Sequence, residues 1–192
     1  RYSCFRDEQK VIVSSDKDFY QLLDQNTILY RPVQKKLLTQ NSIIEEHGIH
    51  PNNFALARAI VGDKSDNLDG VPGIGLKTVA KRFPFFEKEE DVYVNDLIEF
   101  CENQESNAKA FTSIKENKPL IQSNYNLMQL YSPSLSAQTK QSIEWIIDNF
   151  EHTFNKTQTY KMMLEDGINE ISWSAMFESF ARIQRDKKEL NK

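Results

Sequence analysis

The run from Gly62 to Thr78, GDKSDNLDGVPGIGLKT, places two carboxylates directly before a glycine-rich hairpin. Asp63 and Asp66 lie three residues apart, so they share one face if this segment is helical. The glycines of the hairpin permit positive φ angles and let another group approach the backbone closely. Carboxylate clusters hold divalent metal ions, and glycine turns at helix starts bind phosphates. The run therefore predicts metal-dependent chemistry on a nucleic-acid backbone.

The residues after the hairpin predict a short amphipathic helix with a basic surface. Apolar residues recur at the i, i+3, i+4, i+7 spacing from Leu76 to Phe83. The N–H groups at the start of that helix point at the glycine turn, which makes a seat for a phosphate. Residues 70–86 contain three basic residues and no acid, as expected for contact with the DNA backbone without sequence reading. The predicted DNA-binding residues are Gly73, Gly75, Lys77, Thr78, Lys81 and Arg82. The alternative for these residues is a packing corner between two helices with glycine caps.

A second pair of carboxylates follows a short apolar run. Residues 11–15, VIVSS, are predicted to form a buried strand, and Asp16 and Asp18 follow it. Carboxylates at the carboxyl end of a parallel strand lie where α/β sheets place their sites, and residues two apart face the same side of an extended chain. Oxygen ligands of this kind suit Mg²⁺ or Mn²⁺. Each pair alone also fits a helix cap or an acidic surface turn. The predicted metal ligands and catalytic residues are Asp16, Asp18, Asp63 and Asp66.

Together these motifs resemble the 5′ nuclease family. The resemblance covers residues 8–86 and rests on VIVSSDKDFYQLL followed by GDKSDNLDGVPGIGLKT. That family includes flap endonucleases, the 5′ nuclease domain of bacterial DNA polymerase I and the phage enzyme called ribonuclease H, and the chain looks closest to the phage branch. The resemblance implies a PIN-like α/β core in which carboxylates bind two or more divalent ions. It also implies a helix–hairpin–helix that binds duplex DNA and holds a K⁺ ion through backbone carbonyls.

The family's remaining metal ligands, and the basic arch that threads a 5′ end, come from an N-terminal half that is not found in this sequence. We therefore expect the chain to be the C-terminal part of a 5′ nuclease. Residues 1–69 would then be the end of the nuclease core, at the edge of a parallel sheet. Residues 70–192 would be the helix–hairpin–helix and a mostly helical C-terminal body. Alone, this chain is expected to bind metal weakly and to cut little or nothing.

The resemblance implies an activity for the complete enzyme. It would hydrolyse phosphodiesters near the 5′ end of branched or nicked duplex DNA, or of RNA primers, during DNA replication. Its partners would be duplex or branched DNA, RNA–DNA hybrids, and the missing N-terminal half. Two alternatives remain open: a non-catalytic module that binds duplex DNA, and a complementing subunit of a split nuclease.

Charge and composition restrict where DNA can contact the chain. The net charge is −4, and residues 87–109 contain eight acidic and two basic residues. We expect that acidic stretch to be a solvated face turned away from DNA. The two cysteines lack zinc-binding spacing, so reduced thiols in the cytoplasm of a bacterium or a phage-infected cell are expected. No apolar run is long enough to span a membrane, and no membrane partner is expected.

Hydrophobic periodicity predicts the remaining elements. Strands are expected at residues 27–31 and 36–38. Helices are expected at 17–24, 43–47, 51–61, 91–103, 106–116 and 140–150, with a last helix that opens at Trp173. Pro119 and Pro133 are expected to mark connections. The aromatic residues of the last helix are expected to pack in a core rather than to stack on bases.

Overall fold

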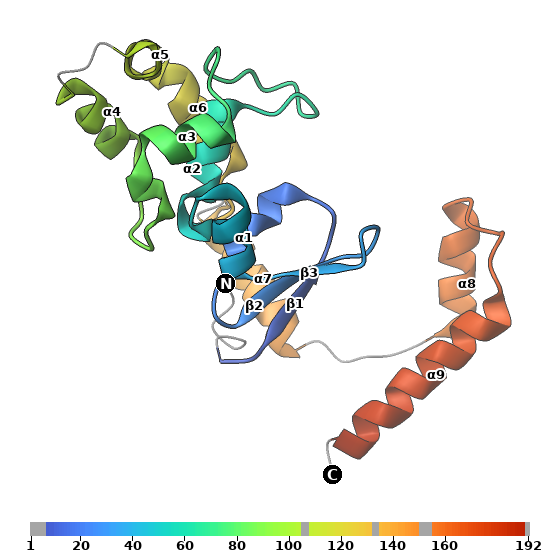
Figure 1. Ribbon diagram of the computed structural model, residues 1–192. Helices are drawn as coiled ribbons and strands as arrows, with labels where there is room; N and C mark the ends of the chain where they lie inside the picture. Colours follow the sequence, from blue (N-terminus) through green and yellow to red (C-terminus); the bar gives the residue numbers. More distant parts are fainter. Residues whose placement is uncertain (1–6, 105–107, 132–134, 150–154, 191–192) are drawn as a thin grey trace. The chain divides into compact units, whose positions relative to one another are not determined.

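The computed structural model describes residues 7–104, 108–131, 135–149 and 155–190. The chain forms two compact units, residues 1–134 and residues 135–192. Unit 1 contains a small sheet and the helices through α6, and unit 2 contains three further helices (Figure 1). The boundary predicted at residue 69 falls inside unit 1, and as a functional boundary it stays a prediction.

The sheet of unit 1 has three strands in the order β1–β2–β3. They are β1 (Lys10–Val13), β2 (Thr27–Arg31) and β3 (Lys36–Leu38). β1 pairs with β2 in parallel, and β2 pairs with β3 antiparallel, as Figure 1 shows. The prediction of a parallel sheet edge is therefore confirmed for β1 and β2, with a short antiparallel strand added beside them.

One face of this sheet is apolar and open, which contradicts the prediction of a buried first strand. Val11 and Val13 of β1 are 54% and 65% exposed, and Leu37 of β3 is 57% exposed. Leu29 and Leu38 pair in register on the other face and are buried in the core. The sheet thus has the alternating pattern of a sheet covered on one side, whereas parallel sheets are usually covered on both.

The helices of unit 1 pack around one central helix, α2 (Pro51–Val61), in which eight of eleven residues are buried. Pro51 occupies the first turn of α2 as predicted, because its missing N–H is unpaired there in any helix. The other elements are η2 (Lys17–Leu22), α1 (Gln40–His47), α3 (Leu76–Arg82), η3 (Pro84–Glu87), α4 (Val94–Glu102), α5 (Lys109–Glu116) and α6 (Lys118–Met128).

The sequence analysis missed α6. Pro119 was expected to mark a connection, but it lies in the first turn of α6, where proline is tolerated. Ile121 and Met128 of α6 are buried in the same core as α2. The helix expected at residues 17–24 is also different: it is the 3₁₀ helix η2, which ends at Leu22.

Three buried side-chain amides of unit 1, those of Asn53, Asn124 and Gln21, form hydrogen bonds that hold its loops and helices together. Asn53 of α2 is 1% exposed, and its Nδ2 donates to the carbonyls of Lys88 (2.9 Å) and Glu90 (3.0 Å). Its Oδ1 accepts from the backbone N of Val92 at 2.9 Å. A single side chain thus satisfies backbone groups across the whole segment between η3 and α4, which has no regular structure of its own.

The other two amides fasten α6. Asn124 Nδ2 donates to the carbonyls of Ala59 (3.0 Å) and Asp69 (2.8 Å), which ties α6 to the end of α2. Gln21 Nε2 donates to the carbonyl of Met128 at 3.0 Å, and its Oε1 accepts from the N of Leu130 at 2.8 Å. These bonds hold the end of α6 against η2.

Unit 2 consists of α7 (Ala137–Asn149), α8 (Lys156–Glu165) and α9 (Trp173–Leu190). The sequence analysis did not predict α8. The ring of Trp173 lies 4.6 Å from that of Tyr160, between ring centroids, and 6.1 Å from that of Phe177. The aromatic residues that open α9 therefore pack against α8 and against one another, but they are not buried in a core as expected, and Phe180 is 40% exposed.

Cys101 of α4 is a buried free thiol, and burial raises its pKa to about 11. Such a thiol stays protonated and unreactive near neutral pH. Cys4, the other predicted reduced thiol, lies outside the described residues. In the part of the chain that the structure describes, no helix combines the length and the apolar character needed to cross a bilayer.

Replacing Asn53 with Ala should lower the free energy of unfolding of unit 1 by about 3 kcal/mol, because buried backbone groups of residues 88–92 lose their partners. Asn52→Ala is the matched control. Asn52 is exposed and donates only to the carbonyl of Glu89, so its loss should cost less than about 1 kcal/mol. Urea unfolding followed by far-ultraviolet circular dichroism measures both. Equal losses in the two variants would contradict the role given to Asn53.

Candidate metal and nucleic-acid site

Asp16 and Asp18 follow β1 at the start of η2. Asp16 is exposed and is the N-cap of η2, and its Oδ1 accepts from the backbone N of Asp18 at 2.9 Å. Asp16 is therefore a helix cap, which was the alternative to a metal ligand in the sequence-based prediction. The side chain of Asp18 is partly buried and turns toward α2. The prediction that the two carboxylates face the same side of an extended chain is therefore wrong, because Asp18 lies in η2 and turns toward α2 while Asp16 is exposed.

Asp63 comes directly after α2, and its side chain is largely buried. Its Oδ1 accepts from the backbone N of Ser65 at 2.8 Å and from Ser65 Oγ at 2.5 Å. The segment 64–67 is a turn closed by a bridge between Asp63 and Leu68, so it is not helical. Asp66 is exposed in that turn. The three-residue spacing therefore does not place Asp63 and Asp66 on a shared helix face.

Arg58 of α2 brings Asp18 and Asp63 together. Its Nη2 lies 3.4 Å from Asp18 Oδ1 and also forms an ion pair with Asp63 Oδ2. Two carboxylates from distant parts of the chain thus share one guanidinium nitrogen. The sequence analysis missed Arg58. The signal for it was present, because Arg58 is the single charged residue in the otherwise largely apolar run of α2.

The charges in this cluster influence one another. Burial raises the pKa of Asp18, the guanidinium of Arg58 opposes that rise, and the negative charges of Asp16 and Asp63 add to it. The hydrogen bond from the Ser65 hydroxyl holds the pKa of Asp63 below its usual value. Asp16, Asp18 and Asp63 therefore create a common negative potential that a cation relieves.

The cluster has the right donor chemistry for Mg²⁺ or Mn²⁺ but offers few donors. Carboxylate oxygens are the ligands that these hard cations prefer. Among the described residues, however, no group of three or more His, Cys, Asp or Glu side chains is arranged to hold a metal ion. Asp18 and Asp63 meet at one cation, Asp16 lies beside Asp18, and Asp66 is exposed in the turn after Asp63. Further oxygen ligands are needed for a complete site.

The hairpin between residues 70 and 75 is anchored by two buried apolar side chains, Val71 and Ile74. Its first glycine has a packing role: a Cβ on Gly70 would meet the carbonyl oxygen of Val61 at 1.9 Å. Gly73 and Gly75 differ, because a Cβ at either would meet nothing within 4 Å. Gly73 has a φ of +79°, which glycine adopts readily. The backbone at these two glycines is therefore open on the side where a Cβ would stand.

The predicted basic residues lie on α3, the helix that follows this turn. Gly75 is the N-cap of α3, and Lys77, Lys81 and Arg82 of α3 are exposed. Lys77 and Lys81 are four residues apart and so share one face of α3, while Val79 is buried. Thr78 is partly buried at the same end of the helix. The arrangement combines positive charge with a glycine turn whose backbone is open to another group.

Part of this chain is similar in sequence to known proteins. No family model matches the chain. A protein named 5'-3' exonuclease from Buchnera aphidicola subsp. Schizaphis graminum is 40% identical over 88 residues, which are 46% of this chain and 31% of that protein. The thermostable DNA polymerase I of Thermus aquaticus is 44% identical over 70 residues, which are 36% of this chain and 8% of the polymerase. The chain thus spans less than a third of the length of each of these relatives.

Solved structures of bacteriophage T5 5'-exonuclease share the fold. One with bound zinc aligns with 62% of this chain and 42% of its own, at a TM-score of 0.53 and 24% identity. Another, a flap endonuclease in a complex with DNA and metal ions, aligns over the same shares at a TM-score of 0.52 and 22% identity. The resemblance predicted from the motifs is therefore confirmed: the chain is homologous to the 5'-3' exonucleases and to DNA polymerase I, and its structural neighbours are T5 5'-exonuclease and flap endonuclease.

Proposed function

We propose that this chain supplies part of the metal site and the duplex-binding hairpin of a 5′-3′ nuclease that hydrolyses phosphodiesters in DNA. The observation that carries the proposal is the meeting of Asp18 and Asp63 at one cation, Arg58, directly before the open hairpin. A negative cluster beside a basic, backbone-exposing turn is suited to hold a metal ion and a phosphodiester near each other.

The chain's own residues have distinct roles in this proposal. Asp16, Asp18, Asp63 and Asp66 would bind Mg²⁺ or Mn²⁺, which activates water and stabilises the leaving oxyanion when bound. Ser65 orients Asp63 through its two hydrogen bonds. Arg58 holds Asp18 and Asp63 together and limits their mutual repulsion.

The hairpin residues hold the substrate. The backbone at Gly73 and Gly75, with Thr78, would contact phosphates of the duplex directly. Lys77, Lys81 and Arg82 would attract the duplex by charge. A K⁺ ion bound by carbonyls of the hairpin would add to this contact without reading sequence.

We also propose that catalysis needs further chain, as one longer protein or as a separate complementing polypeptide. Two observations support this. The described carboxylates do not make a three-ligand metal group. The face of the sheet that carries Val11, Val13 and Leu37 is apolar and open. In a PIN-like core, added strands and helices would cover this face and bring the remaining carboxylates to the carboxyl end of β1.

A non-catalytic duplex-binding module is the second candidate, and one observation favours it. The hairpin and its basic helix lie wholly within the described residues, whereas the metal ligands do not form a complete set. Binding and cleavage therefore need separate tests.

Cleavage tests the metal assignment. Mg²⁺-dependent cutting of a 5′-flap DNA should be negligible for this chain alone and should rise at least about a hundredfold when the N-terminal half of a homologous 5'-3' exonuclease is added. Asp63→Asn with Asp66→Asn should abolish that gain. Asp69→Asn, an exposed acid three residues further on, is the control and should retain it. If the double variant still cleaves the substrate, Asp63 and Asp66 are not metal ligands.

Binding tests the hairpin. Lys77→Ala with Lys81→Ala should weaken binding to duplex DNA of any sequence and reduce the slope of log K against log salt by about 2. Lys109→Ala with Lys115→Ala removes the same charge from exposed positions of α5 and should leave the slope unchanged. Fluorescence anisotropy over a salt series measures both. If both double variants change the salt slope equally, the lysines of α3 have no special role in binding DNA, and the hairpin serves only to pack the helices.

A further inference from the structure

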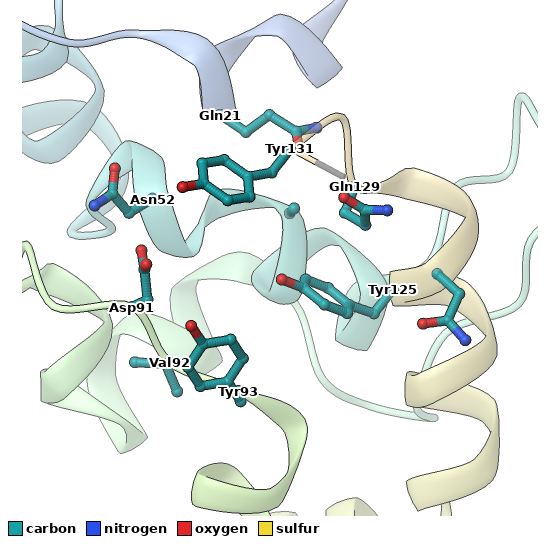
Figure 2. Close-up of a pocket in the computed structure, with 10 residues that line it drawn as sticks. Gln21, Asn52, Asp91, Val92, Tyr93, Tyr125, Gln129 and Tyr131 are labelled. Atoms are coloured by element: carbon teal, nitrogen blue, oxygen red, sulfur yellow. The ribbon is translucent and has the colours of Figure 1, made fainter. Parts of the chain in front are cut away.

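A cavity of about 560 Å³ lies in unit 1, formed by η2, α2, α6 and the segment before α4. None of the four predicted metal ligands lines it. Figure 2 shows polar side chains around a common space, with Asn52, Asp91 and Tyr93 on one side and Tyr125 and Tyr131 on the other. A volume of this size accommodates a long side chain together with a short stretch of backbone.

The walls of this cavity are held in place by the buried amides. Asn53 binds the backbone of residues 88–92, which fixes the position of Asp91 and the start of Tyr93. Gln21, itself a lining residue, fixes the end of α6 and the residues that lead to Tyr131. Tyr125 is carried by α6 next to Asn124, which is bonded to α2. The backbone that carries Asp91 and Tyr93 and the helix that carries Tyr125 are therefore held in place by the fold, while the rings of Tyr93 and Tyr131 are exposed to a ligand.

The negative charge of the cavity favours a cationic ligand over an anionic one. Asp91 is the one charged residue among those that line it, and exposed Glu89 and Glu90 precede Asp91 in the sequence. Besides burial, the phenol of Tyr93 and the carboxylate of Asp91 raise the pKa of Tyr125, so these groups share one electrostatic environment. A phosphate or another anion entering this space meets a negative potential and no lysine or arginine among the lining residues.

We propose that the cavity binds the arginine side chain of a peptide segment in a protein partner. The carboxylate of Asp91 would accept hydrogen bonds from the guanidinium, and the phenol oxygens of Tyr93 and Tyr125 would accept its remaining donors. The exposed ring of Tyr131 would stack on the guanidinium plane. The amide of Asn52 would bind the peptide backbone. This site does not depend on the nuclease activity proposed above.

The test is an NMR titration of the full chain with a blocked Gly-Arg-Gly tripeptide. The signals of Tyr93 and Tyr125 should shift on addition of the peptide. A tripeptide with citrulline in place of arginine has the same shape without the charge and should bind about tenfold more weakly. Thymidine 5′-monophosphate, the probe for a nucleotide occupant, should not shift these signals.

Variants locate the contact. Asp91→Asn should weaken binding of the arginine peptide about tenfold. Glu90→Gln removes the same charge one residue away, outside the cavity lining, and should change binding less than about twofold. Tyr131→Ala alters a side chain that is 78% exposed, so it leaves the fold intact and should weaken binding several-fold.

Three outcomes overturn the proposal. Equal losses in Asp91→Asn and Glu90→Gln would mean that binding is a general charge effect. Equal affinity for the citrulline peptide would remove the cation from the recognition. Shifts at Tyr93 and Tyr125 with thymidine 5′-monophosphate and none with the arginine peptide would assign the cavity to a nucleotide instead.

Discussion

The ion pairs of Arg58 are the interaction on which this account of the site depends. Asp18 reaches the cluster from η2 and Asp63 from the turn after α2, and a single guanidinium between them brings the two segments together. Burial and like charges would otherwise make so close an approach of carboxylates unfavourable. The same negative potential that Arg58 relieves is the one that a divalent cation would use, so the arginine both stabilises the fold and keeps the carboxylates in position.

The helix that carries Arg58 also organises the rest of unit 1. At its start, Asn53 holds the segment before α4, and near its end the carbonyl of Ala59 accepts a hydrogen bond from Asn124 of α6. Directly after it, Gly62 and Gly70 let the backbone fold back tightly into the hairpin. The carboxylate cluster, the hairpin and the aromatic cavity are therefore fixed by one element, although they use different residues and different chemistry.

Local signals allowed much of this to be predicted from the sequence. Pro51 marked the start of α2, short apolar runs marked β2 and β3, and two short motifs identified the resemblance to 5′ nucleases. The features that escaped prediction are decided by contacts between distant residues. A proline in the first turn of a helix cannot be told from one that ends a helix until the packing of that helix is known, as Pro119 of α6 shows. The turn at residues 64–67 depends on hydrogen bonds to Asp63. The open face of the sheet, the partners of Arg58 and the cavity arise only when separate segments meet.

Paramagnetic broadening of NMR signals by Mn²⁺ tests most directly whether the segments of Asp18 and Asp63 share one cation position. In an amide NMR spectrum of the chain, low concentrations of Mn²⁺ should broaden the signals of residues 16–18 and of residues 63–66 together, because both carboxylate segments share one cation position. Arg58→Met should weaken the broadening that the two segments share, because the guanidinium that holds Asp18 and Asp63 together is gone. Broadening confined to the acidic residues 87–91, with both carboxylate segments unaffected, would contradict the account.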